Sequence, residues 1–403
     1  MDFTFLADRP VAKYRRSDSH FFLLVILMWG LGIVTLYVCT PGRASYLYDD
    51  ELYFVKRQLM WSIAGFAGFF ATAFFPVKSI KKILPFLTIF TIILCLITHT
   101  GLLGRSGNGA ARWIYIPGLD VTFQPSELMK FVEILFTANL LVKYSDEMES
   151  SQKSVIYPLL GLFVFAMVVF LQRDFSTGIF ILAVGFIMLA GCGIKFRVLI
   201  PIALLMAGIG FLLIFSEKYR VKRIISFFKP DEYILSTGFQ RTSSENTIID
   251  AGLWGNGLGI GIKNLLSIPE VQTDYIFSGW TSAMGFTGVA GYFLLLGFFL
   301  WRGFSISFTC PDKFASYGAF GCTVSIFLQA VINCAVVAGV LPTTGIPLPF
   351  FSYGGSSLLM SFCMCGFIFN ASHCAAENEF EVKDDIDCVI DFETLGAGVK
   401  NYE

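Results

Sequence analysis

The chain has 403 residues, of which 55% are hydrophobic and only 15% are charged, and its formal net charge is −1. Its mean hydropathy is +0.68. A water-soluble domain of this length needs a larger polar fraction to cover its surface, so the composition excludes that class. The balanced charge gives no overall field for nucleic acid, and we expect no nucleic-acid partner.

Apolar stretches of about 18 residues or more recur along the chain, and that length crosses the hydrocarbon core of a bilayer. They predict an all-α fold, a polytopic transmembrane helical bundle with about ten spans. The expected spans are 21–40, 58–75, 83–101, 127–142, 155–172, 178–193, 198–216, 275–300, 314–338 and 353–371. The first is too long and too poorly terminated for a cleaved signal peptide.

Basic residues in the short loops predict the orientation, because they concentrate on the cytoplasmic side. They favour the side of the N-terminus, and an even number of spans then returns the C-terminus to the same side. We therefore expect a cytoplasmic segment 1–20, a membrane domain 21–371 and an acidic, disordered cytoplasmic tail 372–403.

Two loops on the predicted outer side are informative, 102–126 and the large loop 217–274 between the seventh and eighth spans. The large loop opens with basic and apolar residues that alternate from Lys218 to Lys229, which is typical of a helix lying at a membrane interface. Long loops are exempt from the rule on basic residues. The phosphates of lipid headgroups or of a lipid-linked substrate would suit such a segment.

Ionisable residues at membrane depth are costly, which makes them candidates for a functional site. Glu127, Lys130 and Glu133 share one face of the fourth span. They either neutralise one another or line a substrate cavity, and we favour the cavity. Asp174 lies between the fifth and sixth spans, either in an ordinary polar turn or at the mouth of a cavity, and the residues leave both open.

Asp274 lies where the large loop meets the eighth span. A carboxylate there loses hydration, which raises its pKa and makes it a better base near neutral pH. The alternative is a helix N-cap, and the residues alone favour the cap.

Three further patterns concern packing. The glycine-rich run 252–261 indicates close backbone packing rather than a phosphate loop, since no Lys-Ser/Thr follows it. The segment 341–357 breaks helix repeatedly, which indicates a re-entrant or cavity-lining segment near the outer face. Asn333 is expected to hydrogen-bond between helices. The ten cysteines read as small apolar fillers, with no disulfide framework and no metal site implied.

Six motifs in order resemble the SEDS family of shape, elongation, division and sporulation proteins. They are Asn108–Ile114 with Gln124–Glu127, Asp174 with Thr177-Gly178, Tyr219–Phe227, Gly252–Gly259, Pro269–Phe277 and Leu341–Ser357. The Leu-Trp-Gly-x-Gly-Leu-Gly run from Leu253 is more similar to the FtsW branch of that family than to the RodA branch.

The resemblance implies a peptidoglycan glycosyltransferase that polymerises lipid II, an undecaprenyl-pyrophosphoryl disaccharide-pentapeptide, on the outer face of the cytoplasmic membrane. The family's essential Asp maps onto Asp274, which would take the proton from the acceptor sugar's 4-hydroxyl. This reverses the preference for a helix cap. It also implies a class B penicillin-binding protein and, for the FtsW branch, division-complex membrane proteins as partners.

The resemblance also implies a set of substrate-binding residues. The pyrophosphate needs counter-charge, and the candidates are Lys130, Arg220 and Arg223. With these included, the expected set is Arg112, Trp113, Gln124, Glu127, Lys130, Asp174, Arg220, Arg223, Glu270 and Thr273. A divalent cation, Mg²⁺ or Mn²⁺, is compatible with the chemistry, and no metal ligands are assigned.

The chain departs from the family pattern twice. Gln272 stands where the family has His, and Ser282-Ala283-Met284-Gly285 replaces Glu-Glu-Leu-Gly. Three alternatives to a septal polymerase remain: a lipid II flippase, an elongation or sporulation homologue, and a scaffold that activates a partner transpeptidase. The two departures favour only the scaffold among them. The concentration of polar motifs on the outer side favours the enzyme over the flippase.

Overall fold

The computed structural model describes residues 18–98, 104–107, 110–116, 121–150, 155–215, 217–229, 238–257, 268 and 270–373. Most of the predicted N-terminal segment, the acidic tail from residue 374, Asn108, Pro269 and the part of the glycine-rich run after residue 257 lie outside these residues.

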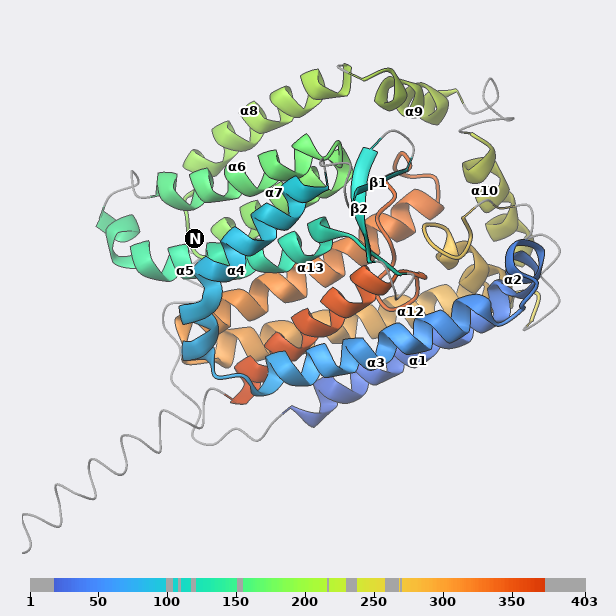
Figure 1. Cartoon of the computed structure of the whole chain (residues 1–403), viewed down its shortest axis with the longest axis horizontal. Coiled ribbons are helices and arrows are strands. Elements are labelled where there is room, and N and C mark those ends of the chain that lie inside the picture. The colour runs from blue at the N-terminus through green and yellow to red at the C-terminus, as the bar shows by residue number, and fades with distance from the viewer. Residues whose placement is uncertain are drawn as a thin grey trace, which may run out of the picture.

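A helix lies at each of the ten predicted spans, and together they form an elongated bundle (Figure 1). The helices are α1 (Ser19–Cys39), α3 (Tyr53–Phe74), α4 (Val77–Ile97), α5 (Pro125–Ser150), α6 (Ile156–Leu171), α7 (Phe175–Gly191), α8 (Phe196–Phe215), α12 (Ile276–Thr309), α13 (Lys313–Val337) and Gly355–His373. The main boundary errors concern α5 and α12, which continue beyond the predicted ends at 142 and 300.

Five of the described helices are long and apolar enough to cross a membrane: α1, α4, α12, α13 and Gly355–His373. Large apolar side chains also stand exposed on the outside of the bundle, such as Phe86, Leu204 and Leu294, at 71%, 68% and 67% exposure. Water-soluble monomers rarely expose so much apolar surface, whereas a lipid-facing surface requires it. The protein is therefore a helical membrane protein, and the number of ten crossings stays a prediction.

The centre of the bundle is α13, which packs against α12, α5 and α7. The last helix, Gly355–His373, lies along α3, where the Thr72 hydroxyl donates to the carbonyl of Cys363. The helix α8 lies at the edge, against α7 and α9 (Lys218–Phe228) (Figure 1).

One end of the bundle, here called the sheet end, carries the short helices and the strands (Figure 1). Its helices are α2 (Pro41–Tyr48), α9, which forms where the basic segment predicted it, and α10 (Phe239–Ala251). At the opposite end, here called the terminal end, the backbone N–H of Asp18 donates to the hydroxyl of Ser372.

A small antiparallel sheet at the sheet end corrects the purely helical prediction. Its strands are β1 (Gly104–Gly107), β2 (Ala110–Ile116) and β3 (Val121–Phe123), in that order. The residues Trp113, Ile114 and Tyr115 of β2 have the β-branched and aromatic side chains that suit a strand. Because β3 ends directly before α5, the sheet places β2 against the first turn of that helix.

The helix α12 is broken at Gly285, where φ is 63°. The glycine-rich turn after α10 supplies hydrogen bonds at this break. The N–H groups of Asn256 and Gly257 donate to the carbonyls of Ser282 and Ala283, at 2.8 and 3.1 Å. A Cβ on Gly255 would lie 2.6 Å from the nitrogen of Gly285. Close backbone packing, predicted for this run, is confirmed at Gly255.

Candidate functional site

A polar pocket opens at the sheet end between β2, α5, α7 and the segment 345–347. Its empty volume is about 460 Å³, open solvent included. Six predicted site residues line it: Arg112, Trp113, Gln124, Glu127, Lys130 and Asp174. The pocket also contains Gly345, Ile346 and Pro347, so the predicted cavity lining by the segment 341–357 is confirmed.

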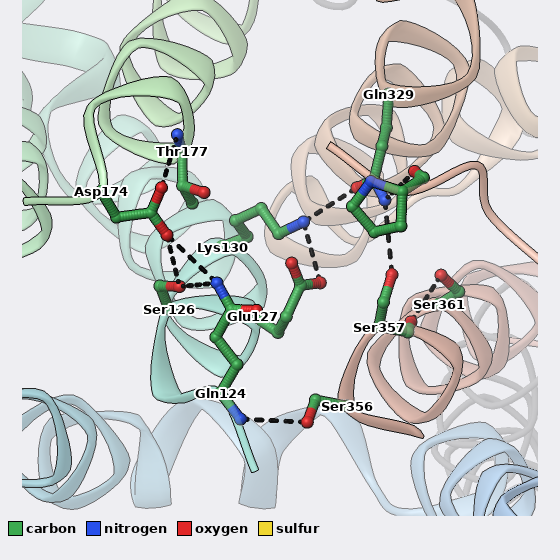
Figure 2. A network of polar contacts seen from close by, with 11 residues as sticks. Gln124, Ser126, Glu127, Lys130, Asp174, Thr177, Gln329, Ser356, Ser357 and Ser361 are labelled. Atoms are coloured by element: carbon green, nitrogen blue, oxygen red, sulfur yellow. Dashed lines mark hydrogen bonds and ion pairs between the residues drawn. The ribbon is translucent and has the colours of Figure 1, made fainter. Parts of the chain in front are cut away.

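Asp174 connects α7 to the start of α5 (Figure 2). Its Oδ1 accepts from the N–H of Thr177 and caps α7, and its Oδ2 accepts from Gln124 Nε2 at 3.1 Å and from Ser126 Oγ at 3.3 Å. The Arg112 guanidinium lies 3.6 Å from the same carboxylate. The turn and the cavity alternatives are therefore both correct, because one buried side chain does both.

Lys130 lies at the bottom of the pocket, where its Nζ is 2.9 Å from Glu127 Oε2 and 2.8 Å from Gln329 Oε1 (Figure 2). The two charged side chains are only 4% and 6% exposed. The ion pair and the cavity lining are again compatible. Glu133, predicted on the same face, is not part of the pocket lining and accepts instead from the Thr137 hydroxyl at 2.9 Å.

Gln329 of α13 is a site residue that sequence reasoning missed. Its Oε1 accepts from Lys130, and its Nε2 donates to the carbonyl of Pro347 at 2.9 Å. A glutamine inside an apolar span is itself a signal, because membrane helices rarely bury an amide without a partner.

Asp274 lies beside the pocket rather than among its lining residues, and its Oδ2 would be 3.7 Å from a Cβ on Gly345. The side chain is half-buried. Burial is the main cause that raises the pKa of this carboxyl, Glu270 adds to it and Arg223 opposes both, and the pKa that results is about 6. The N-cap of α12 is Tyr275, with no side-chain bond, so the cap alternative for Asp274 is wrong.

Three consecutive carbonyls fix the turn that carries Asp274. The carbonyl of Gln272 accepts from the N–H of Tyr353 at 2.7 Å, and that of Thr273 accepts from Ser352 Oγ at 2.5 Å. The carbonyl of Asp274 accepts from Asn333 Nδ2 at 2.9 Å. The turn is therefore bound to α13 and to the segment before the last helix.

The remaining predicted residues surround this turn. Glu270 has a φ of 57°, and its Oε2 accepts from Gln272 Nε2 at 3.1 Å. The Thr273 hydroxyl donates to the carbonyl of Glu270. The Arg223 guanidinium donates to the carbonyl of Thr343 at 2.9 Å, and its charge acts on the carboxyl of Asp274.

Arg220 lies near two other arginines, Arg112 and Arg173. Its guanidinium lies 4.8 Å from the ring centre of Phe175. Burial lowers its pKa below the ordinary value and Glu217 opposes this, while the nearby charges of Arg112 and Arg173 lower it too. Three guanidinium groups near the mouth of a pocket make a favourable place for an anion.

The described residues fit a resident metal poorly. No group of three His, Cys, Asp or Glu side chains comes together among them. Glu127 and Asp174 are engaged with cations and amides. A magnesium ion commonly binds through one or two carboxylates and the substrate's phosphates. Asp274 and Glu270, whose charges interact, are the remaining predicted carboxylates of the site.

Asn333 was predicted to bond between helices, and this is wrong. Its Nδ2 donates to two carbonyls of segments without regular structure, those of Asp274 and Ile346, each at 2.9 Å. The amide faces the site because both acceptors lie there.

The comparisons with known proteins agree with this architecture. Residues 18–377 match the family model of the FtsW/RodA/SpoVE cell cycle proteins. A probable peptidoglycan glycosyltransferase FtsW of Geobacter sp. (strain M18) is 34% identical over 88% of this chain and 96% of its own length. Stage V sporulation protein E of Bacillus subtilis (strain 168) is 34% identical over 89% of this chain and 98% of its own.

Solved structures share the fold. One chain, from a study of polymerization and crosslinking by a peptidoglycan synthase complex, has a TM-score of 0.75 at 24% identity and covers 90% of this chain and 99% of its own. The rod shape determining protein RodA of Thermus thermophilus has a TM-score of 0.64 at 23% identity and covers 89% and 98%.

The helical bundle and the pocket at its sheet end define a multi-pass membrane protein with a buried, charged site. Its sequence match extends over nearly the whole described region. The chain belongs to the FtsW/RodA/SpoVE family of cell cycle proteins.

Proposed function

We propose that this chain is a peptidoglycan glycosyltransferase that polymerises lipid II on the outer face of the cytoplasmic membrane, in septal synthesis, with Asp274 as general base. The observation that carries the proposal is a half-buried carboxylate with a pKa of about 6 beside a polar pocket. A base works best when its pKa lies near the working pH. The relatives named as FtsW support the septal role.

In the proposed reaction Asp274 takes the proton of the acceptor sugar's 4-hydroxyl. The hydroxyl oxygen attacks the anomeric carbon of the donor and forms the new glycosidic bond. The bond from that carbon to the lipid diphosphate breaks, and the diphosphate leaves with the electron pair. One displacement inverts the configuration, so one base suffices and no covalent nucleophile is needed.

The leaving diphosphate needs positive charge near it. Arg112 and Lys130 offer it inside the pocket, and Arg220 and Arg223 offer it from α9. Trp113, Gln124, Glu127, Asp174, Glu270 and Thr273 complete the proposed substrate site. A divalent cation would come with the diphosphate.

The proposed setting places both termini in the cytoplasm and the sheet end outside. A class B penicillin-binding protein is the proposed partner, together with membrane proteins of the division complex. The structural likeness to a chain of a peptidoglycan synthase complex supports a partner transpeptidase.

The floor of the pocket favours an enzyme over a flippase. Beyond the Lys130–Gln329 bond, α5 and α13 meet through apolar contacts: a Cβ on Gly321 would touch Ile134, and one on Gly318 would touch Phe367 and Leu135. A flippase needs a polar route through the bundle for the headgroup. The apolar contacts at Gly318 and Gly321 oppose such a route between α5 and α13, where the buried Glu133 carboxylate bonds to Thr137 of its own helix.

The test is polymerisation of fluorescent lipid II by the full chain purified with its class B penicillin-binding protein, read as glycan on a gel. We expect Asp274→Asn to abolish the product, because the amide cannot accept the proton. The control is Asp250→Asn, which changes an exposed carboxylate of α10 at the same end of the bundle and should keep the parent's rate.

Glycan made by the Asp274→Asn protein at the parent's rate would remove Asp274 from the mechanism. Equal transbilayer movement of labelled lipid II by both proteins, without polymer, would instead establish the flippase. Glycan formed by the partner alone would establish the scaffold.

A further inference from the structure

Two amide side chains of α13 form hydrogen bonds to the segments that make up the site. Asn333 and Gln329 are four residues apart and therefore lie on one face of the helix, one turn from each other. They are 1% and 4% exposed, and neither is accounted for by the reaction proposed above.

The two amides contact adjacent carbonyls of the pocket wall. Asn333 donates to the carbonyl of Ile346 and Gln329 to that of Pro347, each at 2.9 Å. Residues 345–347 line the pocket, so these bonds fix one of its walls to the bundle.

Each amide has a second partner, which belongs to a charged residue of the site. Asn333 donates to the carbonyl of Asp274 at 2.9 Å, and Gln329 Oε1 accepts from Lys130 at 2.8 Å. The proposed base and the pocket's buried cation are thus tied to consecutive residues of one wall.

The chemistry of the two acceptors fixes the orientation of the Asn333 amide. Both acceptors are carbonyl oxygens, so only the NH₂ group can face them, and it uses one hydrogen for each. Its Oδ1 is buried without a hydrogen-bond partner. Such an orphan atom is unfavourable in a buried position, and the cost indicates that the arrangement of the two bridged segments is what the residue serves.

We propose that Asn333 and Gln329 are positioning residues of the glycosyl transfer: Asn333 holds the turn of Asp274 against the pocket wall, and Gln329 holds Lys130 on the other side of it. This inference rests on the proposed function. It assigns neither residue a contact with substrate.

The chain offers a matched control for Asn333. Asn370, 6% exposed, also donates from Nδ2 to two carbonyls, those of Thr72 and Phe75, at 2.8 and 2.7 Å. These carbonyls lie at the end of α3, at the terminal end of the bundle and away from the pocket. Replacing either asparagine by leucine keeps a similar volume and removes the same two donors.

The test compares the full chains carrying Asn333→Leu and Asn370→Leu, each with the partner transpeptidase, in steady-state polymerisation of fluorescent lipid II across pH. We expect similar drops in melting temperature. We expect only Asn333→Leu to lower kcat, by about 100-fold, because a displacement of about 1 Å at a reacting group costs that much.

The pH profile separates positioning from general damage. Burial is the main cause of the raised pKa of Asp274, so a released turn admits water and lowers that pKa. The rise of kcat with pH should then move to lower pH in Asn333→Leu. The charged groups around Asp274 are Glu270 of its own turn and Arg223 of α9, with the Tyr275 phenol beside Arg241 and Glu245, and none of them is altered.

Gln329→Leu should act differently, by raising KM for lipid II while leaving the pH profile in place, because it loosens Lys130 and not the base. If Asn333→Leu does not fold, Asn333→Ser retains one hydroxyl donor and should show a smaller loss of kcat with the same direction of shift.

A parent-like kcat and pH profile in both Asn333 variants, with Asp274→Asn inactive, would overturn this inference alone. An equal loss of kcat in Asn370→Leu would also overturn it. An active Asp274→Asn protein would instead overturn the proposed role of the base.

Discussion

The two ends of the bundle use the same side chain for different purposes. At the terminal end, Asn370 donates to Thr72 and Phe75, whose carbonyls a helix leaves without intrahelical partners at its C-terminus. At the sheet end, Asn333 donates to Asp274 and Ile346, which belong to two segments without regular structure. The first amide completes a helix and the second joins the walls of a site. The segments that a residue bridges, rather than its bonds alone, indicate its role.

The ion pairs of the two ends differ in the same way. Lys130–Glu127 is almost fully buried in the pocket, with side chains 4% and 6% exposed. Arg302–Asp18 joins α12 to the start of α1 at the terminal end, with 25% and 8% exposed. A buried pair that loses one partner leaves an uncompensated charge, whereas a more exposed one is screened by solvent.

The largest expected effect on stability comes from Lys130→Met, which strands the Glu127 carboxylate. We expect a loss of about 3–5 kcal/mol in the free energy of unfolding, measured by denaturation in detergent. Arg302→Met at the terminal end should cost clearly less and should leave polymerisation intact.

The double variant Lys130→Met, Glu127→Gln is the control for charge. It should recover much of the stability, because no ion remains unpaired, but not the activity. A double variant as unstable as Lys130→Met would show that packing rather than charge dominates there.

A smaller effect on stability should distinguish alanine substitutions at two glycines of the turn that bonds to the break in α12. Gly255 and Gly257 both have positive φ, 76° and 80°, so an added Cβ strains either by about 1–3 kcal/mol. Only at Gly255 would that Cβ also collide, with the backbone of Ala283 and Gly285. Gly255→Ala should therefore lower the melting temperature more than Gly257→Ala. Equal melting temperatures would contradict the role given to this contact.

The sequence predicted the helices well because hydropathy is a local property. The errors at the ends of α5 and α12 arise because both helices continue as polar or interrupted segments, which a search for apolar runs stops short of. The sheet was missed although the sequence carries a local signal for it. The Asn108-Gly109 pair is a strong hairpin signal, but it lies in a loop that was searched only for polar motifs.

The site could be predicted only in part. Residue types and family motifs selected the six predicted side chains that line the pocket. They did not select Gln329, although a glutamine inside an apolar span is a signal. The acceptors of Gln329 and Asn333 could not be predicted, because they depend on how α13 packs against the segment 345–347. The residues around Asp274 alone favoured a helix cap, and the family resemblance reversed this. The fold shows why the local reading fails, since the N-cap of α12 is Tyr275.

The most direct test of the account is the rate of polymerisation of lipid II by the parent from about pH 5 to about pH 8. A general base must be ionised, so the rate should rise with pH through the pKa of Asp274, about 6, and the Asp274→Asn protein should make no glycan at any pH. A rate that does not change across this range, or glycan from the Asp274→Asn protein, would contradict the assignment of the base.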